Sequence, residues 1–297
     1  MVVAKDIAVE EKSPSGISII WRELVRDKIA FISFLLVVIL ASAVYITSAI
    51  LDQAEIVRVD LFAMYEPPSA EYWLGTDYGG RDVFGQLIIG TANSLQVGVF
   101  VTLLSGTVGV LVGLIAGYFG NWTDNILMRI LDFFQSLPSL MIIIVAVTIV
   151  SSYDVFSFSL IMSTFLWMHI TRIIRAKVMQ ESAQEYIHAA RTLGSSHVKI
   201  MFYHLLPNVM SLIIVTMTLN LAANIGIESG LSFLGFGFPE STPSLGTLVS
   251  YARNPQVLEY RPWIWLPASL LIFVLMLCIN NVGQALKRAT DAKQRRG

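Results

Sequence analysis

The segment EYIHAARTLGSSHVKIMFYHLLPN, residues Glu185 to Asn208, is polar and basic and separates two strongly apolar runs of the chain. It opens with a helix-favouring sequence, passes Gly194, continues in a second amphipathic turn and reaches Pro207. A segment of this kind between apolar runs is where we expect the chain to contact a partner.

The composition places the surrounding runs in a membrane. Hydrophobic residues make up 55% of the chain, charged residues 14%, and the mean hydropathy is +0.67. An ordinary soluble domain has about 25% charged residues. The one cysteine, Cys278, excludes an internal disulfide and a cysteine-based metal site.

Six apolar runs are long enough to cross a bilayer, which takes about 20 residues of helix. They cover about residues 29–51, 94–119, 126–150, 155–174, 209–227 and 263–282. We therefore predict an all-α membrane protein with six transmembrane helices. Its predicted parts are a tail with an interfacial helix at 1–28, a first transmembrane helix at 29–51, an outer loop at 52–90, a core of five helices at 91–285 containing an inner loop at 175–208, and a tail at 286–297.

The positive charges predict the orientation of these helices. Six spans put both termini on one side, and the segments on that side hold sixteen Lys and Arg residues against four in the outer loops. Because positive charge is retained on the cytoplasmic face, we expect both termini and the 175–208 loop to be cytoplasmic. The remaining surface of the spans would contact membrane lipid.

The residues give no sign of enzymatic chemistry. No Gly-Lys pair is available for a phosphate-binding loop, and no nucleophile elbow occurs. The four histidines, His169, His188, His197 and His204, match no zinc-binding spacing. We expect a protein that is not an enzyme, binds no cofactor or metal of its own and does not bind nucleic acid.

A glycine series in the second run predicts close helix packing. Gly109, Gly113 and Gly117 recur every four residues and would share one smooth helix face. Such faces let a neighbouring membrane helix approach closely where lipid offers no hydrophobic driving force.

A polar stripe runs along the fifth apolar segment. Thr216, Asn220, Asn224 and Glu228 recur every four residues, so they lie on one side of a helix. A charge at the bilayer centre costs about 2.5 to 3.5 kcal/mol, so Glu228 should face protein or water. Two interpretations stay open: the stripe lines a translocation path, or it forms hydrogen bonds between helices worth about 0.6 kcal/mol per pair.

The segment 185–208 resembles the EAA loop of binding-protein-dependent ABC importer permeases. Ala189, Ala190, Gly194, Leu206 and Pro207 are in register with that pattern. His188 stands where the family has Glu, and Glu185 could supply a carboxylate one turn earlier. The resemblance implies that these residues couple the chain to ATPases.

Three further blocks are similar to the C-type permease subunit of dipeptide and oligopeptide importers. They are LGTDYGGRDVF at 74–84, AGYFGNWTDNILMRILDFFQSLPSL at 116–140 and ESGLSFLGFGFPESTPSLG at 228–246. The resemblance implies a type I ABC importer permease fold in a bacterial plasma membrane. It also implies a heterodimer with a B-type permease, two cytoplasmic ATPases that bind ATP and Mg, and an extracytoplasmic peptide-binding protein.

The details of the loop agree with a docking role. Small side chains at Ala189 and Ala190 would let a short helix lie close to a partner, and Gly194 can adopt a positive φ between two helices. Pro207 would begin the next membrane helix, where its missing N–H is tolerated. A histidine at 188 facing the ATPase would make docking sensitive to pH near neutrality.

Three alternatives remain at this point. The first is a permease for nickel or another small ligand. The second is an ion-coupled secondary transporter in which Glu228 and Asp132 form the relay, although the internal symmetry between halves expected of many such proteins is not seen. The third is a membrane scaffold that conducts nothing.

Overall fold

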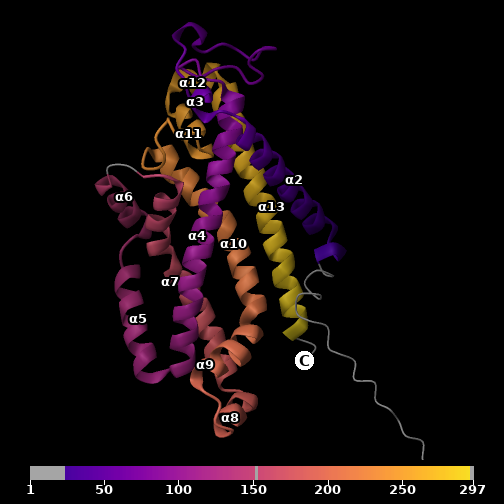
Figure 1. Ribbon diagram of the computed structural model, residues 1–297, viewed down its shortest axis with the longest axis vertical. Helices are drawn as coiled ribbons and strands as arrows, with labels where there is room; N and C mark the ends of the chain where they lie inside the picture. Colours follow the sequence, from indigo (N-terminus) through magenta and orange to yellow (C-terminus); the bar gives the residue numbers. More distant parts are fainter. Residues whose placement is uncertain (1–23, 151–152, 295–297) are drawn as a thin grey trace, which may run out of the picture.

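The computed structural model describes residues 24–150 and 153–294. Within these ranges every regular element is helical, apart from one isolated bridge between Thr76 and Asp82 (Figure 1). The predicted all-α class is therefore confirmed.

Five helical segments are long and apolar enough to span a membrane, and a bent pair makes a sixth if it is one span. The five are α2 (Lys28–Ile50), α4 (Val83–Phe119), α7 (Val155–Ser182), the continuous segment His197–Leu234 and α13 (Pro262–Gln294). The pair is α5 (Asn121–Gln135) and α6 (Ser139–Ile149), which meet at an angle of 75°.

The bend between α5 and α6 differs from the continuous helix predicted for 126–150. Pro138 is the residue that precedes α6, with an extended backbone. Proline has no N–H to donate and disfavours a helical residue before it, so the helix is interrupted there. A hydropathy window averages the amphipathic α5 with the apolar α6, so it does not detect this break.

Short helices gather at the two ends of the long ones (Figure 1). One end, called here the α12 end, holds α3 (Gln53–Ile56), η1 (Leu61–Ala63), α11 (Leu245–Ser250), η3 (Tyr251–Arg253) and α12 (Pro255–Tyr260). The opposite end, called the α8 end, holds α8 (Glu185–Thr192) and α9 (His197–Lys199).

The start of α2 and the end of α13 lie side by side. Leu24, Ala30 and Ala285 form one apolar cluster, and Arg288 pairs with Asp27. Asp27 also accepts hydrogen bonds from the backbone of Ile29 and Ala30, which fixes the start of α2. Helix α13 continues to Gln294, so residues 286–294 are helical where a tail was predicted. Most of the predicted tail at 1–28 lies outside the described residues.

Helix α4 begins earlier than the apolar run that predicted it, so the outer loop is shorter than 52–90. The Asp82 side chain accepts hydrogen bonds from the backbone N–H groups of Phe84 and Gly85, at 3.1 and 2.9 Å, and starts the helix. The first turns hold polar residues such as Gln86 and Thr91 that are buried by neighbouring elements. Their polarity hid this part of the helix from a hydropathy reading.

The glycine face of α4 lies against α7. A Cβ atom added at Gly109, Gly113 or Gly117 would lie 2.8, 2.9 or 2.8 Å from a carbonyl oxygen of the α7 backbone. These distances are too short for a side chain, so the two helices approach each other through glycine.

Candidate functional site

Helix α8 has one buried face and one exposed face. Ile187 is fully buried and Ala190 nearly so, in a cluster with residues of α4, α7 and the start of α10 (Leu206–Leu234). His188 and Ala189 are exposed on the other face, and Glu185 is exposed in the first turn. The expectation that both alanines face a partner is thus wrong for Ala190, which packs inside its own chain.

The turn between α8 and α9 is built on Gly194. Its φ is +78°, and Ser195 N donates to Ala190 O at 3.1 Å, as in a Schellman motif. The Ser196 side chain then accepts from Lys199 N and starts α9. The two short helices therefore have a defined connection in place of a loose linker.

Three apolar or aromatic side chains project from this end of the molecule. Leu193 is 85% exposed, Tyr203 75% and Val198 61%. We call these three residues the loop tip. An apolar group on an otherwise polar loop is typical of an interaction site. Sequence reasoning missed them, although their apolar character among charged neighbours was a usable signal.

Tyr118, in the last turn of α4, holds both helices of the loop. The Arg191 guanidinium lies 4.7 Å from the centre of its ring, a cation–π contact, and its hydroxyl lies 2.8 Å from His197 Nδ1. The ring itself is buried in the apolar cluster that also contains Ile187 and Ala190. Tyr118 therefore fixes α8 and α9 relative to the transmembrane helices.

Tyr186 makes a second anchor. Its hydroxyl donates to Glu181 Oε2 at 3.2 Å, at the end of α7, and accepts from Asn208 Nδ2 at 2.8 Å, in α10. Partial burial raises the pKa of the Tyr186 hydroxyl, the hydrogen bond from Asn208 lowers it, and the Glu181 charge raises it again. The hydroxyl thus joins the two helices that flank the loop.

The loop continues without a break into α10. Residues Ile200–Leu205 (η2) form a π-helical stretch in which Leu206 N donates to Met201 O. Pro207 lies in the first turn of α10, but helix already precedes it, so it does not begin the span after a loop. Leu206 is half-buried and Pro207 exposed. The loop and α10 form one helical rod from His197 to Leu234.

Two residues of the polar stripe of α10 form hydrogen bonds with α4. Asn224 Nδ2 donates to Thr102 Oγ1 at 2.9 Å, and Ser94 Oγ donates to Glu228 Oε2 at 2.7 Å. Thr216 is also buried, whereas Asn220 is half-buried and bonds within its own helix. The geometry supports hydrogen bonding between helices for Asn224 and Glu228, and it gives no support for their lining a path.

The α12 end is held together by a buried ion pair. Arg81 Nε lies 2.8 Å from Asp77 Oδ2, and these side chains are 5% and 0% exposed. Arg81 Nη2 also donates to Tyr251 and Glu240, at 3.1 and 3.2 Å. Burial alone would lower the pKa of Arg81, but Tyr251, Asp77 and Glu240 raise it above its ordinary value. Gln86 of α4 donates from Nε2 to Asp77 Oδ2 at 3.0 Å, so this network is joined to the start of α4.

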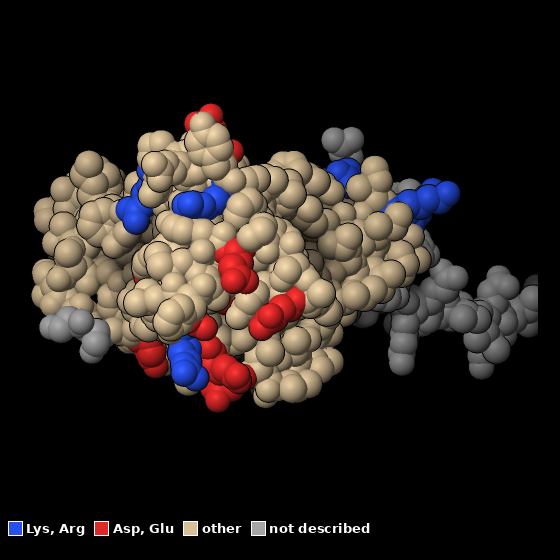
Figure 2. Space-filling model, turned by 90° about the horizontal axis from the view of Figure 1, so that it is seen from above, with Lys and Arg blue, Asp and Glu red and all other residues tan. Residues whose placement is uncertain are grey.

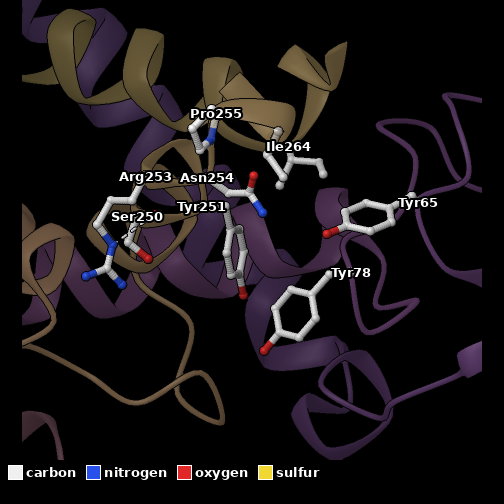
Figure 3. A pocket seen from close by; sticks show the side chains of 9 residues that line it. Tyr65, Tyr78, Ser250, Tyr251, Arg253, Asn254, Pro255 and Ile264 are labelled. Carbon is white, nitrogen blue, oxygen red and sulfur yellow. Dashed lines mark hydrogen bonds between the residues drawn. The ribbon is translucent and has the colours of Figure 1, made fainter. Parts of the chain in front are cut away.

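A cavity of about 710 Å³ opens beside this network (Figure 3). Three tyrosine rings and an apolar floor give it a mixed surface. Its lining is Tyr65, Tyr78, Ser250, Tyr251, Arg253, Asn254, Pro255, Val257 and Ile264. No group of three or more His, Cys, Asp or Glu side chains suited to a metal ion occurs among the described residues.

Comparison with protein families gives one match. The family described as "Binding-protein-dependent transport system inner membrane component" matches residues 109–295, which include the loop, α10 and α13. The match therefore covers the loop and the two helices on either side of it, α7 and α10.

Curated relatives match over nearly the whole chain. The oligopeptide transport system permease protein OppC of Lactococcus lactis subsp. cremoris is 43% identical over 289 residues, covering 96% of this chain and 98% of that protein. Proteins with the same description are 35% identical over 280 residues in Mycobacterium tuberculosis, covering 94% and 95%, and 34% identical over 271 residues in Bacillus subtilis, covering 91% and 87%.

Proposed function

This chain belongs to the family of binding-protein-dependent transport system inner membrane components, and we propose that it is the permease subunit of an ATP-driven oligopeptide importer. The observation that carries the substrate class is the 43% identity to an oligopeptide permease over 96% of the chain. As a multi-pass membrane subunit it would supply part of the translocation path and no catalytic group.

The α8 end faces the cytoplasm in this proposal. The segments 52–82 and 235–261, at the α12 end, carry nine Asp and Glu residues against four Arg. Figure 2 shows acidic side chains gathered on this end, with fewer basic ones. The excess of positive charge in the remaining non-spanning segments supports a cytoplasmic position for α8, α9 and both termini.

The exposed face of the loop is the surface we assign to the ATPase. His188, Ala189 and the loop tip are accessible, while Ile187 and Ala190 anchor the loop from below. Docking would bury the loop tip, and Tyr118 and Tyr186 would pass the resulting displacement to α4, α7 and α10. Glu185, Gly194, Leu206 and Pro207 would act in this coupling by shaping the loop, and ATP and Mg would bind on two partner ATPases.

The other partners follow from the same proposal. A B-type permease would complete the path as a heterodimer, and an extracytoplasmic peptide-binding protein would deliver peptide to the α12 end. Thr216 and Asn220 remain candidates for residues near the path, since neither has a hydrogen bond to another helix among the described contacts.

Uptake by the reconstituted complex tests the substrate class. The chain, its permease partner, the ATPases and the binding protein would be placed in proteoliposomes with ATP inside. We expect uptake of radiolabelled oligopeptides and none of radiolabelled nickel. Nickel uptake without peptide uptake would favour the small-ligand alternative.

The same system tests the ion-coupled alternative. Family membership favours ATP-driven transport, and Asp132 is paired with Arg172 at the protein surface, away from Glu228 in the interior. Uptake by this chain alone, driven by a proton or sodium gradient, would reverse that conclusion.

A further inference from the structure

The carboxyl group of Glu228 is fully buried where α4, α10 and α11 meet. Its Oε2 atom accepts a hydrogen bond from Ser94 Oγ of α4 at 2.7 Å, and its Oε1 atom accepts from Ser232 Oγ of α10 at 2.8 Å. Ser94 Oγ also accepts from the backbone N–H of Leu245, the first residue of α11, at 3.0 Å. One hydroxyl thus connects the carboxyl group of α10 to α11.

The backbones around this group are in direct contact. A Cβ atom at Gly90 would lie 2.9 Å from the carbonyl carbon of Ser244, and one at Gly246 would lie 2.5 Å from Ser229 O. Asn93 Nδ2 donates to Pro243 O at 2.7 Å. Because no side chain separates these segments, a displacement of one must move the others.

Helix α10 leads from this group to the opposite end of the protein. The helical rod His197–Leu234 contains Glu228 near one end and joins the loop at the other. Its loop end is anchored by Leu205 and Val209 in the cluster that holds α8. The rod therefore joins the loop tip and the α12 end through continuous secondary structure.

We propose that Glu228 is a positioning residue for transport, which fastens the segment 235–261 to α10 through Ser94 and Leu245. Docking at the α12 end would then change the position of the loop tip, and docking at the loop tip would change the α12 end. Such coupling is reciprocal by thermodynamic necessity. The inference rests on the proposed function, which supplies partners at both ends.

Two serines allow a matched test of this role. Ser94 and Ser229 both donate to Glu228 Oε2, at 2.7 and 3.3 Å, and both are buried. Ser94 connects α4 and α11 to the carboxyl group, whereas Ser229 is its neighbour in the same helix. Ser94→Ala removes the connection between elements, and Ser229→Ala removes a contact within α10.

The measurement is ATP hydrolysis by the complete complex in nanodiscs, with and without peptide-loaded binding protein. We expect Ser94→Ala to lower the stimulation by binding protein about fivefold, as the loss of one buried hydrogen bond in the coupled state would. Ser229→Ala should retain stimulation within about twofold of the wild type. Equal losses in the two variants, or full stimulation in Ser94→Ala, would overturn the proposal.

Glu228→Gln and Glu228→Leu provide a second test that does not depend on Ser94→Ala assembling. Gln keeps one oxygen that can accept from Ser94, so it should retain part of the stimulation, whereas Leu should lose it. Assembly of each complex is checked by size-exclusion chromatography. If Gln and Leu assemble and behave alike, the hydrogen bond does not position the segment.

The proposed function fails separately from this inference. A wild-type complex that takes up no peptide contradicts the function. A wild-type complex that takes up peptide, with unchanged stimulation in Ser94→Ala, contradicts only the role of Glu228.

Discussion

The two ends of this protein are held together by different kinds of contact. At the α8 end, Leu193 and Tyr203 are exposed while the loop is anchored by apolar residues beneath it. At the α12 end, Asp77 and Arg81 are buried as an ion pair and connect several segments. Apolar packing therefore anchors the loop at the α8 end, whereas a buried ion pair organises the α12 end.

The largest effect on stability is expected at the α12 end. Arg81→Ala would leave the Asp77 carboxylate buried without its cation, which typically costs about 3 to 5 kcal/mol. We expect a large drop in the melting temperature of the purified subunit in detergent. Arg58→Ala, an exposed arginine of the same segment, should have little effect. Equal melting temperatures of the two variants would show that the buried ion pair does not stabilise the α12 end.

A change at the loop tip should reduce function without reducing stability. Leu193 is 85% exposed, so Leu193→Asp removes little packing within the chain. Burying the new carboxylate in an interface without a partner would cost several kcal/mol, so peptide uptake should fall at least about tenfold. The melting temperature should stay close to that of the wild type.

The control for this variant adds the same charge elsewhere in the loop. Gln184→Asp lies at the start of α8, where an acidic residue is favourable, and it should retain uptake. Loss of uptake in both variants would indicate a general effect of charge on the loop, and the assignment of Leu193 to the interface would then be wrong.

A smaller effect is expected at Tyr118, which joins the loop to α4. Tyr118→Phe removes the hydroxyl contact with His197 and keeps the ring beneath Arg191. The loss of one such hydrogen bond is worth about 1 kcal/mol. We expect a modest decrease in binding-protein-stimulated ATP hydrolysis, and a larger one in Tyr118→Ala, in which the ring is also lost. Indistinguishable variants would show that the ring contributes nothing.

The smallest effect concerns pH and the contact between the start of α2 and the end of α13. The hydrogen bond from the Ala30 backbone N–H, and after it the contact with Arg288, lower the pKa of Asp27 below its ordinary value of 3.8. Its carboxylate stabilises the fold fully above that value, and the contribution is lost as the pH falls through the lower pKa of the folded state. A melting curve measured across acidic pH should show a slightly shallower decline for Asp27→Asn than for the wild type. Identical declines would mean that Asp27 contributes nothing to acid sensitivity.

The sequence was most informative where apolar length and small residues determine the structure. Long apolar runs predicted the spanning helices, and the spacing of Gly109, Gly113 and Gly117 predicted a packing face that lies on α7. It was least informative where polar side chains are buried. The first turns of α4 look like a loop because Gln86 and Thr91 are polar, yet other elements cover them.

In the candidate site, too, the sequence predicted some features and not others. The pattern around Gly194 indicated two short helices and a turn, which the structure contains. It could not tell that Ala190 faces inward and Ala189 outward, because adjacent residues on a helix differ by about 100° and the buried side depends on the neighbouring helices. Tyr118 contacts His197, which is 79 residues away in sequence, so its role follows only from the tertiary structure.

The continuous helix from His197 to Leu234 also sets a mechanical scale. It contains 38 residues, which at 1.5 Å per residue give a lever of roughly 57 Å. If it pivots at Glu228, the arm to His197 is roughly 46 Å long, so each degree of tilt moves the far end by about 0.8 Å. A rotation of about 5° would then shift the ATPase contact by about 4 Å, most of the pitch of one helical turn.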